Sequence, residues 1–217
     1  MLAHFLEIDL LTIIQAAGWP IWPLLACSVV ALALIIERLL SLRAHAIAPE
    51  GLLDQVIAAS QNAIPTADVL LQLESHSVLG QIMSHGFKSL QHNHFIADAD
   101  LRQSIETQGR QVAHSLDKRL TALATIASAA PLLGLLGTVI GMIDIFGSQT
   151  PGSSNPALLA QGISMALYNT AFGLIVAIPT LMFWRYFRAR VDAFVMDLEV
   201  QAEHFARHLL QLRSRLR

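Results

Sequence analysis

One apolar run, from about Ala122 to Phe146, has a length that matches a membrane rather than a water-soluble core. A helix needs about 20 residues to cross the hydrocarbon core of a bilayer, which is about 30 Å thick. The middle of the run, 129–141, is rich in small residues. Helices in lipid associate through close packing, which small side chains permit. We therefore predict a spanning helix that protein surrounds on a face formed by Pro131, Gly134, Thr138 and Gly141.

A second stripe of small residues lies in the apolar run from about Leu158 to Phe183. It repeats at helical spacing and comprises Ala166, Thr170, Gly173 and Ala177. The composition agrees with a membrane protein, because 54% of residues are hydrophobic and 14% are charged, whereas a soluble domain carries about 25% charged residues. The formal net charge of −2 gives no indication of a nucleic-acid partner.

The predicted fold class is an all-α membrane protein with three transmembrane helices and long cytoplasmic helical extensions. The expected segments are an amphipathic periplasmic segment over 1–18, transmembrane helices over 19–42, 121–146 and 158–184, a cytoplasmic helical domain over 43–120, a periplasmic loop over 147–157 and a cytoplasmic C-terminal helix over 185–217. Residues 1–18 could equally be the first turns of the next helix. Glu37, Arg38 and Arg43 close the first span, where they are expected to pair or to extend toward water.

The orientation follows from the distribution of positive charge. All 14 Lys and Arg residues lie after residue 37 and outside 147–156, at the end of the first span, in the long polar segment or in the tail. Positively charged residues remain on the cytoplasmic side of a membrane. The N-terminus is therefore expected in the periplasm, and the C-terminus in the cytoplasm.

The polar segments carry helix-packing patterns. Leu101, Ile105, Val112, Leu116 and Leu120 form one apolar stripe, and no turn signal follows Leu120, so this helix is expected to continue into the second span. In the tail, apolar residues recur at spacings of four and three, which is typical of a helix packed on another helix. They are Val191, Val195, Leu198, Ala202, Phe205, Leu209 and Leu212.

Neither an enzyme signature nor a cofactor motif is apparent, and no metal site is expected, because the His pairs at 92/94 and 204/208 lack further ligands. The candidate functional groups are instead polar residues inside the spans. Thr138 and Thr170 each place a hydroxyl near mid-depth on a small-residue face. The alternative is that these hydroxyls only bond carbonyls of their own helices. Asp144, near the outer end of its span, is either an interfacial residue or a cation entry point.

These residues resemble the MotA/TolQ/ExbB proton-channel family, in particular its shorter ExbB/TolQ branch. The resemblance covers nearly the whole chain and is carried by the strings at 130–139, 162–167, 170–174 and 177–179. It implies a multi-pass protein of the bacterial inner membrane that forms a homo-oligomeric ring, in this family a pentamer. The second and third spans would line a central pore, and the family's pore threonines map onto Thr138 and Thr170.

The resemblance also implies partners. Single-span proteins of the ExbD/TolR type would occupy the pore and supply a titrating aspartate, and a TonB/TolA-like protein could transmit the work to the outer membrane. One departure is Met165, where the family leads us to expect a glutamate, and Tyr168-Asn169 replaces small residues. The predicted function is a proton-driven motor subunit. The alternatives are an oligomeric scaffold without ion flow and an autonomous channel, which the dry, small-residue lining disfavours.

Overall fold

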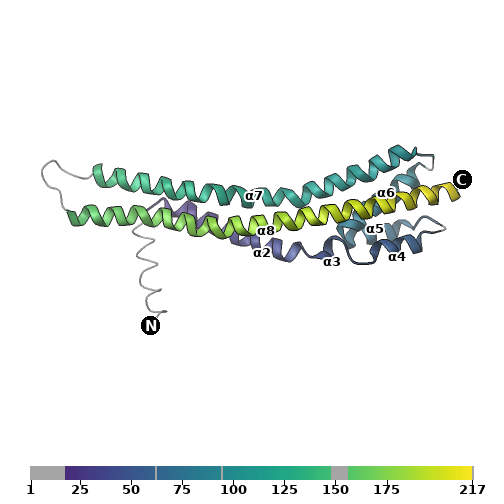
Figure 1. The fold of residues 1–217 in the computed structure, drawn as a ribbon, viewed down its shortest axis with the longest axis horizontal. Helices are drawn as coiled ribbons and strands as arrows, with labels where there is room; N and C mark the ends of the chain where they lie inside the picture. Colours follow the sequence, from purple (N-terminus) through teal and green to yellow (C-terminus); the bar gives the residue numbers. More distant parts are fainter. Residues whose placement is uncertain (1–17, 62, 94, 148–155, 217) are drawn as a thin grey trace, which may run out of the picture. The chain divides into compact units, whose positions relative to one another are not determined.

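The computed structural model describes residues 18–61, 63–93, 95–147 and 156–216, and every regular element in these ranges is a helix. Figure 1 labels the helices in chain order: α2 (Ile21–Ser41), α3 (Ala44–Ile47), α4 (Leu52–Ala59), α5 (Ala67–His76), α6 (Val78–His92), α7 (Asp98–Gly147) and α8 (Pro156–Leu216). This confirms the all-α prediction. Residues 1–17 of the predicted amphipathic segment, and residues 148–155 of the predicted loop, lie outside the described residues.

Three helices, α2, α7 and α8, are long and apolar enough to cross a membrane. The predicted spans 19–42, 121–146 and 158–184 each fall on one of them. The helix α7 continues without a break past Leu120 and Thr121, which confirms the predicted continuity. The positions at which a membrane would begin and end on these helices, and the side on which each terminus lies, stay predictions.

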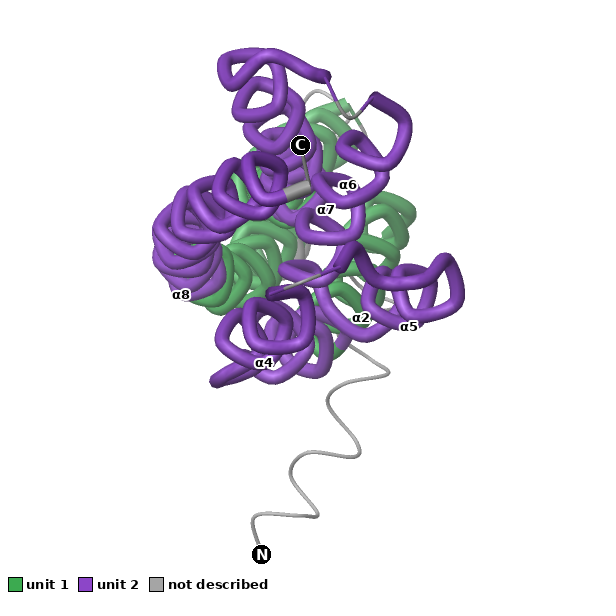
Figure 2. The backbone as a smooth tube through the Cα atoms, turned by 90° about the vertical axis from the view of Figure 1, so that its right-hand side faces the viewer, with its two compact units in different colours: residues 1–36, 121–185 green, residues 37–120, 186–217 purple. Residues whose placement is uncertain are grey.

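The chain divides into two compact units, which are coloured separately in Figure 2. Unit 1 comprises residues up to 36 together with 121–185, and unit 2 comprises residues 37–120 together with 186–217. Each of the three long helices therefore contributes a segment to both units.

Unit 1 has a small core and an apolar exterior. Leu24 of α2, Ala130 of α7 and Val176 and Ala177 of α8 are buried together. Large apolar side chains point away from this core, among them Leu132, Leu136, Val139, Ile175, Ile178 and Met182. Such an exterior is incompatible with water but suited to lipid or to further membrane helices.

Unit 2 is held together by the two patterns that the sequence predicts. The whole stripe from Leu101 to Leu120 is buried, and so are five of the tail residues: Val191, Leu198, Phe205, Leu209 and Leu212. Phe205 also meets Phe87 of α6 edge to face, with ring centroids 5.0 Å apart. The tail of α8 therefore packs against α6 in this unit, and Gly86 of α6 also lies close to Ile105 of α7.

His208 of α8 is not simply solvated, because its Nε2 shares a hydrogen bond of 2.9 Å with Oγ of the buried Ser60 at the end of α4. Burial lowers the pKa of the His208 imidazole from its ordinary value, and the charge of Arg215 lowers it further, against an opposing effect of a hydrogen bond with the Ser60 backbone. The residue is a packing contact between α4 and α8.

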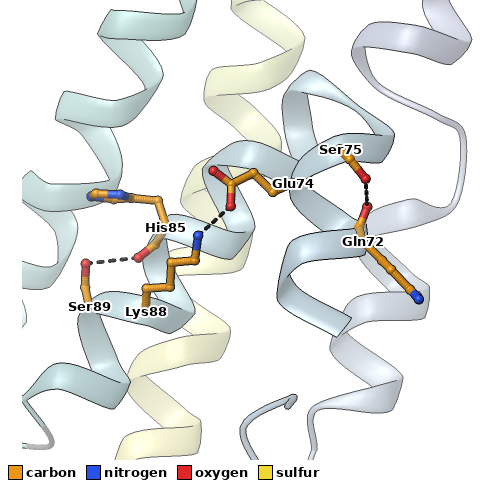
Figure 3. Close-up of polar contacts among 6 residues, drawn as sticks. All are labelled: Gln72, Glu74, Ser75, His85, Lys88 and Ser89. Atoms are coloured by element: carbon orange, nitrogen blue, oxygen red, sulfur yellow. Dashed lines mark hydrogen bonds and ion pairs between the residues drawn. The ribbon is translucent and has the colours of Figure 1, made fainter. Parts of the chain in front are cut away.

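The helices α5 and α6 form a tight pair joined at Ser77, whose hydroxyl caps α6 by accepting a 3.0 Å hydrogen bond from the Gly80 amide. Figure 3 shows Glu74 of α5 and Lys88 of α6 pointing toward each other, and the two side chains form an ion pair. Gly80 permits the close packing of α5 and α6, since a Cβ at its position would lie 2.0 Å from the carbonyl oxygen of Leu73 in α5.

We expect Gly80→Ala to lower the free energy of unfolding by about 2 kcal/mol or more, because overpacking against backbone forces the helices apart. The matched control is Gly109→Ala on α7, where a Cβ would meet nothing within 4 Å. Alanine is the better helix former by about 1 kcal/mol, so the control is expected to be neutral or stabilising. Helicity followed by circular dichroism during thermal unfolding checks both variants, and equal midpoints would contradict the expectation.

Candidate functional site between α7 and α8

Within unit 1, α7 and α8 approach each other closely enough for their backbones to touch. A Cβ placed on Gly134 would lie 2.8 Å from the carbonyl oxygen of Asn169, and one on Gly173 would lie 2.7 Å from that of Ala130. These distances are shorter than any real Cβ contact. Only glycine therefore allows this separation, which is how small residues promote helix association in lipid.

The close contact extends along both predicted stripes. A Cβ on Gly141 would meet the Cβ of Ala166 at 3.2 Å, which leaves little space between the helices there as well. Ala177 is buried in the core cluster, and Pro131 is half-buried inside α7. The two stripes thus face each other within one chain. Whether they also line the centre of an assembly stays a prediction.

The two predicted hydroxyls meet at this contact. Thr138 Oγ1 and Thr170 Oγ1 are 2.5 Å apart, so one hydroxyl donates to the other. Thr138 Oγ1 also lies 3.2 Å from the carbonyl oxygen of Ala166 on the opposite helix and 3.3 Å from the carbonyl oxygen of Gly134 on its own helix. Thr170 reaches the same Gly134 carbonyl across the contact, at 3.1 Å. These bonds between helices go beyond the alternative in which each hydroxyl serves only its own helix.

This arrangement offers more acceptors than donors. The two hydroxyls carry one proton each, and the acceptors are each other's oxygen and the carbonyls of Gly134 and Ala166. The hydroxyl protons can therefore be distributed in more than one way without leaving a buried donor unpaired. Both threonines are half-buried, so one side of the pair remains accessible from outside the two helices. The pair can donate to, or accept from, a group that approaches on that side.

Asn169, which departs from the family pattern and lies beside Thr170, is also a site residue. It is 2% exposed, although it lies in an apolar span beside Thr170. Its side chain packs on Gly137, where a Cβ would lie 2.8 Å from the Cβ and 3.0 Å from the Nδ2 of Asn169. In the sequence, the only indication of this residue's role is an amide side chain in the middle of an apolar run. Its partner, Gly137, could not be identified before the structure showed the contact between the two residues.

We expect Gly137→Ala to lower the free energy of unfolding by about 1–3 kcal/mol, because the new methyl group overlaps Asn169. Adding Asn169→Ala removes the Cγ and Nδ2 atoms that overlap but leaves the Cβ at 2.8 Å, so the double variant is expected to recover only part of that loss. A double-mutant cycle measured by unfolding the purified protein in mixed micelles checks this coupling. Strictly additive effects would show that the two positions do not share space.

The remaining predicted groups lie apart from the pair. Asp144 is exposed in the last turn of α7, and the hydrogen bonds described for Thr138 and Thr170 do not include it. Its role as an ion entry point stays a prediction. Met165 lies in α8, but its side chain is outside the part that the structure describes.

The helix pair lies in the part of the chain that matches known proteins. Residues 74–200 match the profile of the MotA/TolQ/ExbB proton channel family. The chain belongs to this family. The match includes all of α7 and more than half of α8, and it contains both Thr138 and Thr170.

Individual relatives agree with the ExbB/TolQ-like branch. The biopolymer transport protein exbB1 of Vibrio cholerae is 31% identical over 172 residues, which cover 77% of this chain and 74% of the relative. The putative biopolymer transport protein ExbB-like 3 of Synechocystis is 32% identical over 178 residues, covering 81% and 83%. The Tol-Pal system protein TolQ of Haemophilus influenzae is 41% identical over 85 residues, covering 38% and 37%.

Family membership indicates where the protein is located and which class of function it has. A proton-channel family and three apolar helices together support an inner-membrane protein and a subunit of a membrane motor. The family is one of transport and motor channels rather than of enzymes.

Proposed function

We propose that this protein is a proton-driven motor subunit that forms a homopentameric ring around single-span partner helices of the ExbD/TolR type. It would couple the proton gradient to work at the outer membrane, either transport or envelope maintenance, with a TonB/TolA-like protein as a further partner. The observation that carries the proposal is the hydrogen-bonded pair Thr138–Thr170, which joins two spans at a contact made of glycine and alanine. The pair's accessible side would face the centre of the ring.

The mechanism rests on the cost of a charge in hydrocarbon. A carboxylate there stays protonated unless hydrogen-bond donors stabilise its charged form. The Thr138 and Thr170 hydroxyls supply such donors without introducing a charge of their own. A partner aspartate beside them would gain a proton from the outer side and release it to the inner side. Each charge that crosses 100 mV provides about 2.3 kcal/mol, which could move the partner helix against the ring.

The alternative function is an oligomeric scaffold that assembles a partner without ion flow. Met165, in place of the glutamate expected from the family, favours this alternative because the ring would then carry one fewer titratable group per subunit. The Thr138–Thr170 bonds would serve only to join the helices, a role worth about 0.6 kcal/mol per interhelical bond on average. Dissipating the proton gradient separates the two functions, since a scaffold would continue to support its partner.

The direct test is reconstitution. The protein and its ExbD/TolR-like partner are incorporated together into vesicles with an imposed proton gradient, and internal pH is followed with a trapped dye. We expect proton flux from the complex and only background leakage from either protein alone. A complex of full size that conducts no protons under a gradient would contradict the motor and favour the scaffold.

A further inference from the structure

A second polar feature lies in unit 2. At the end of α2, a pocket of about 270 Å³ is lined by residues from α2, the start of α3 and α8. Its lining residues include three arginines, Arg38, Arg43 and Arg190, together with Tyr186. No acidic residue is among the described residues that line it.

Arg38 is the unusual member of this group, because it is only 3% exposed. Its Nε has no hydrogen-bond partner among the described residues. The carboxylate of Glu37 comes no closer than 4.0 Å to Nη2 of Arg38, and the same Glu37 oxygen is engaged by Arg119. A buried charge that lacks a close counter-charge is costly. The pocket therefore contains a cation whose hydrogen-bonding capacity the described chain leaves partly unused.

Arg190, which also lines the pocket, is held in place by its neighbours. Its Nη2 donates to the carbonyl oxygen of Leu42 at 3.3 Å, and its guanidinium lies 5.3 Å from the ring centroid of Phe194. These contacts fix the side chain without neutralising it. Arg43 is exposed beside the pocket at the N-cap of α3. Three arginines thus line one pocket. A guanidinium group can donate two parallel hydrogen bonds to the oxygens of a phosphate.

The surroundings indicate the kind of anion. The pocket lies where the apolar helix α2 ends, and Leu39 and Leu40, in the last turn of α2, are exposed. A soluble anion would not need this apolar surface, whereas the acyl chains of a lipid would cover it. Basic residues at the end of a span are also the usual partners of anionic headgroups.

We infer that this pocket binds the phosphate of an anionic phospholipid headgroup, with Arg38, Arg43 and Arg190 as its ligands. The lipid would supply the counter-charge that Arg38 lacks and would fasten the end of α2 to α8. Phosphatidylglycerol, the simplest such lipid, is expected to bind one molecule per chain. A phosphatidylcholine headgroup also carries a phosphate, but its trimethylammonium group would be repelled by the same arginines.

The test measures lipid binding to the intact assembly by native mass spectrometry after removal of endogenous lipid. Phosphatidylglycerol, phosphatidylcholine and soluble glycerol phosphate are titrated separately. Arg43→Gln removes one exposed ligand and should not disturb folding, while Arg190→Gln also loses the bond to Leu42. The matched control is Arg185→Gln, since Arg185 is exposed beside Tyr186 in sequence but does not line the pocket.

We expect saturable binding of phosphatidylglycerol and about tenfold weaker binding to the Arg43→Gln protein, equivalent to about 1.4 kcal/mol. Arg185→Gln should change the affinity by less than about threefold. An equal loss in both variants would overturn the proposal, because it would mean general attraction to a positive surface. Glycerol phosphate binding as tightly as the lipid would overturn it in favour of a soluble anion. Equal binding of phosphatidylcholine would also overturn it, because the pocket would then not select an anionic headgroup.

Discussion

Replacing both Thr138 and Thr170 by valine is expected to reduce proton flux through the reconstituted complex by at least about thirtyfold. Valine matches threonine in shape but removes both hydroxyls that bond across α7 and α8. A partner carboxylate would then lose hydrogen bonds to its charged form, at about 2 kcal/mol for a single lost partner, which is about thirtyfold in rate. The measurement is the initial rate of pH change in vesicles that contain equal amounts of assembled complex.

Three controls separate a proton role from a structural one. Thr138→Ser with Thr170→Ser keeps the hydroxyls and is expected to retain most of the flux. Thr180→Val removes a buried hydroxyl that, in the described structure, bonds only the Val176 carbonyl of its own helix, and it should leave flux unchanged. The elution volume of each variant establishes that the assembly persists. Undiminished flux in the assembled double-valine protein would exclude these hydroxyls from the pathway.

Introducing methyl groups at the helix contact is expected to have the largest effect on assembly. In Gly134→Ala with Gly173→Ala, each new Cβ would lie within 2.8 Å of a backbone oxygen of the facing helix. Backbone cannot rotate away as a side chain does, so α7 and α8 must separate. We expect the loss of more than about 3 kcal/mol of stability, the upper range for overpacking, and loss of proton flux as well.

The matched control is Gly147→Ala at the end of α7, where a Cβ would meet nothing within 4 Å. It tests whether alanine itself, rather than its location, causes the effect. Size-exclusion chromatography and thermal unfolding report assembly and stability. A double-alanine protein that elutes and unfolds like the control would show that the two helices are not in backbone contact in the membrane.

The sequence is sufficient for the two long helices of unit 2, the first part of α7 and the tail of α8, and for their packing faces. The stripe from Leu101 to Leu120 and the tail pattern around Phe205 are long, periodic and amphipathic, and their apolar faces are buried as expected. The continuity of α7 was also predictable, because no turn signal separates Leu120 from Thr121. In these segments, local pattern and tertiary packing agree.

The partner of the small-residue stripes was less predictable. Gly134, Gly173 and the two threonines recur at helical spacing, which indicates a close neighbour but not which helix it is. The structure supplies one neighbour, the other stripe of the same chain, with Thr138 and Thr170 bonded to each other. A stripe of this kind has the same spacing whether it packs on its own chain or on another subunit. Its role in a ring can therefore be established only from a structure of the assembly.

Long polar side chains were the least predictable part of the chain. Glu37 and Arg38 are adjacent in sequence, and either could have extended to water or found a partner. In the structure, Glu37 pairs with Arg119 while Arg38 turns into a pocket. The position of the Asn169 side chain similarly depends on its contact with Gly137, which lies on another helix. These outcomes depend on contacts between residues far apart in the sequence, which no local pattern encodes.

The most direct test of the central claim is an electron cryomicroscopy map of the protein with its single-span partner in a lipid bilayer. The claim is that the accessible side of the Thr138–Thr170 pair faces a proton-carrying partner helix inside a ring. The map is predicted to show a helix, with an acidic side chain, within hydrogen-bonding distance of these hydroxyls in at least one subunit. Lipid acyl chains against the pair in every subunit would contradict the account.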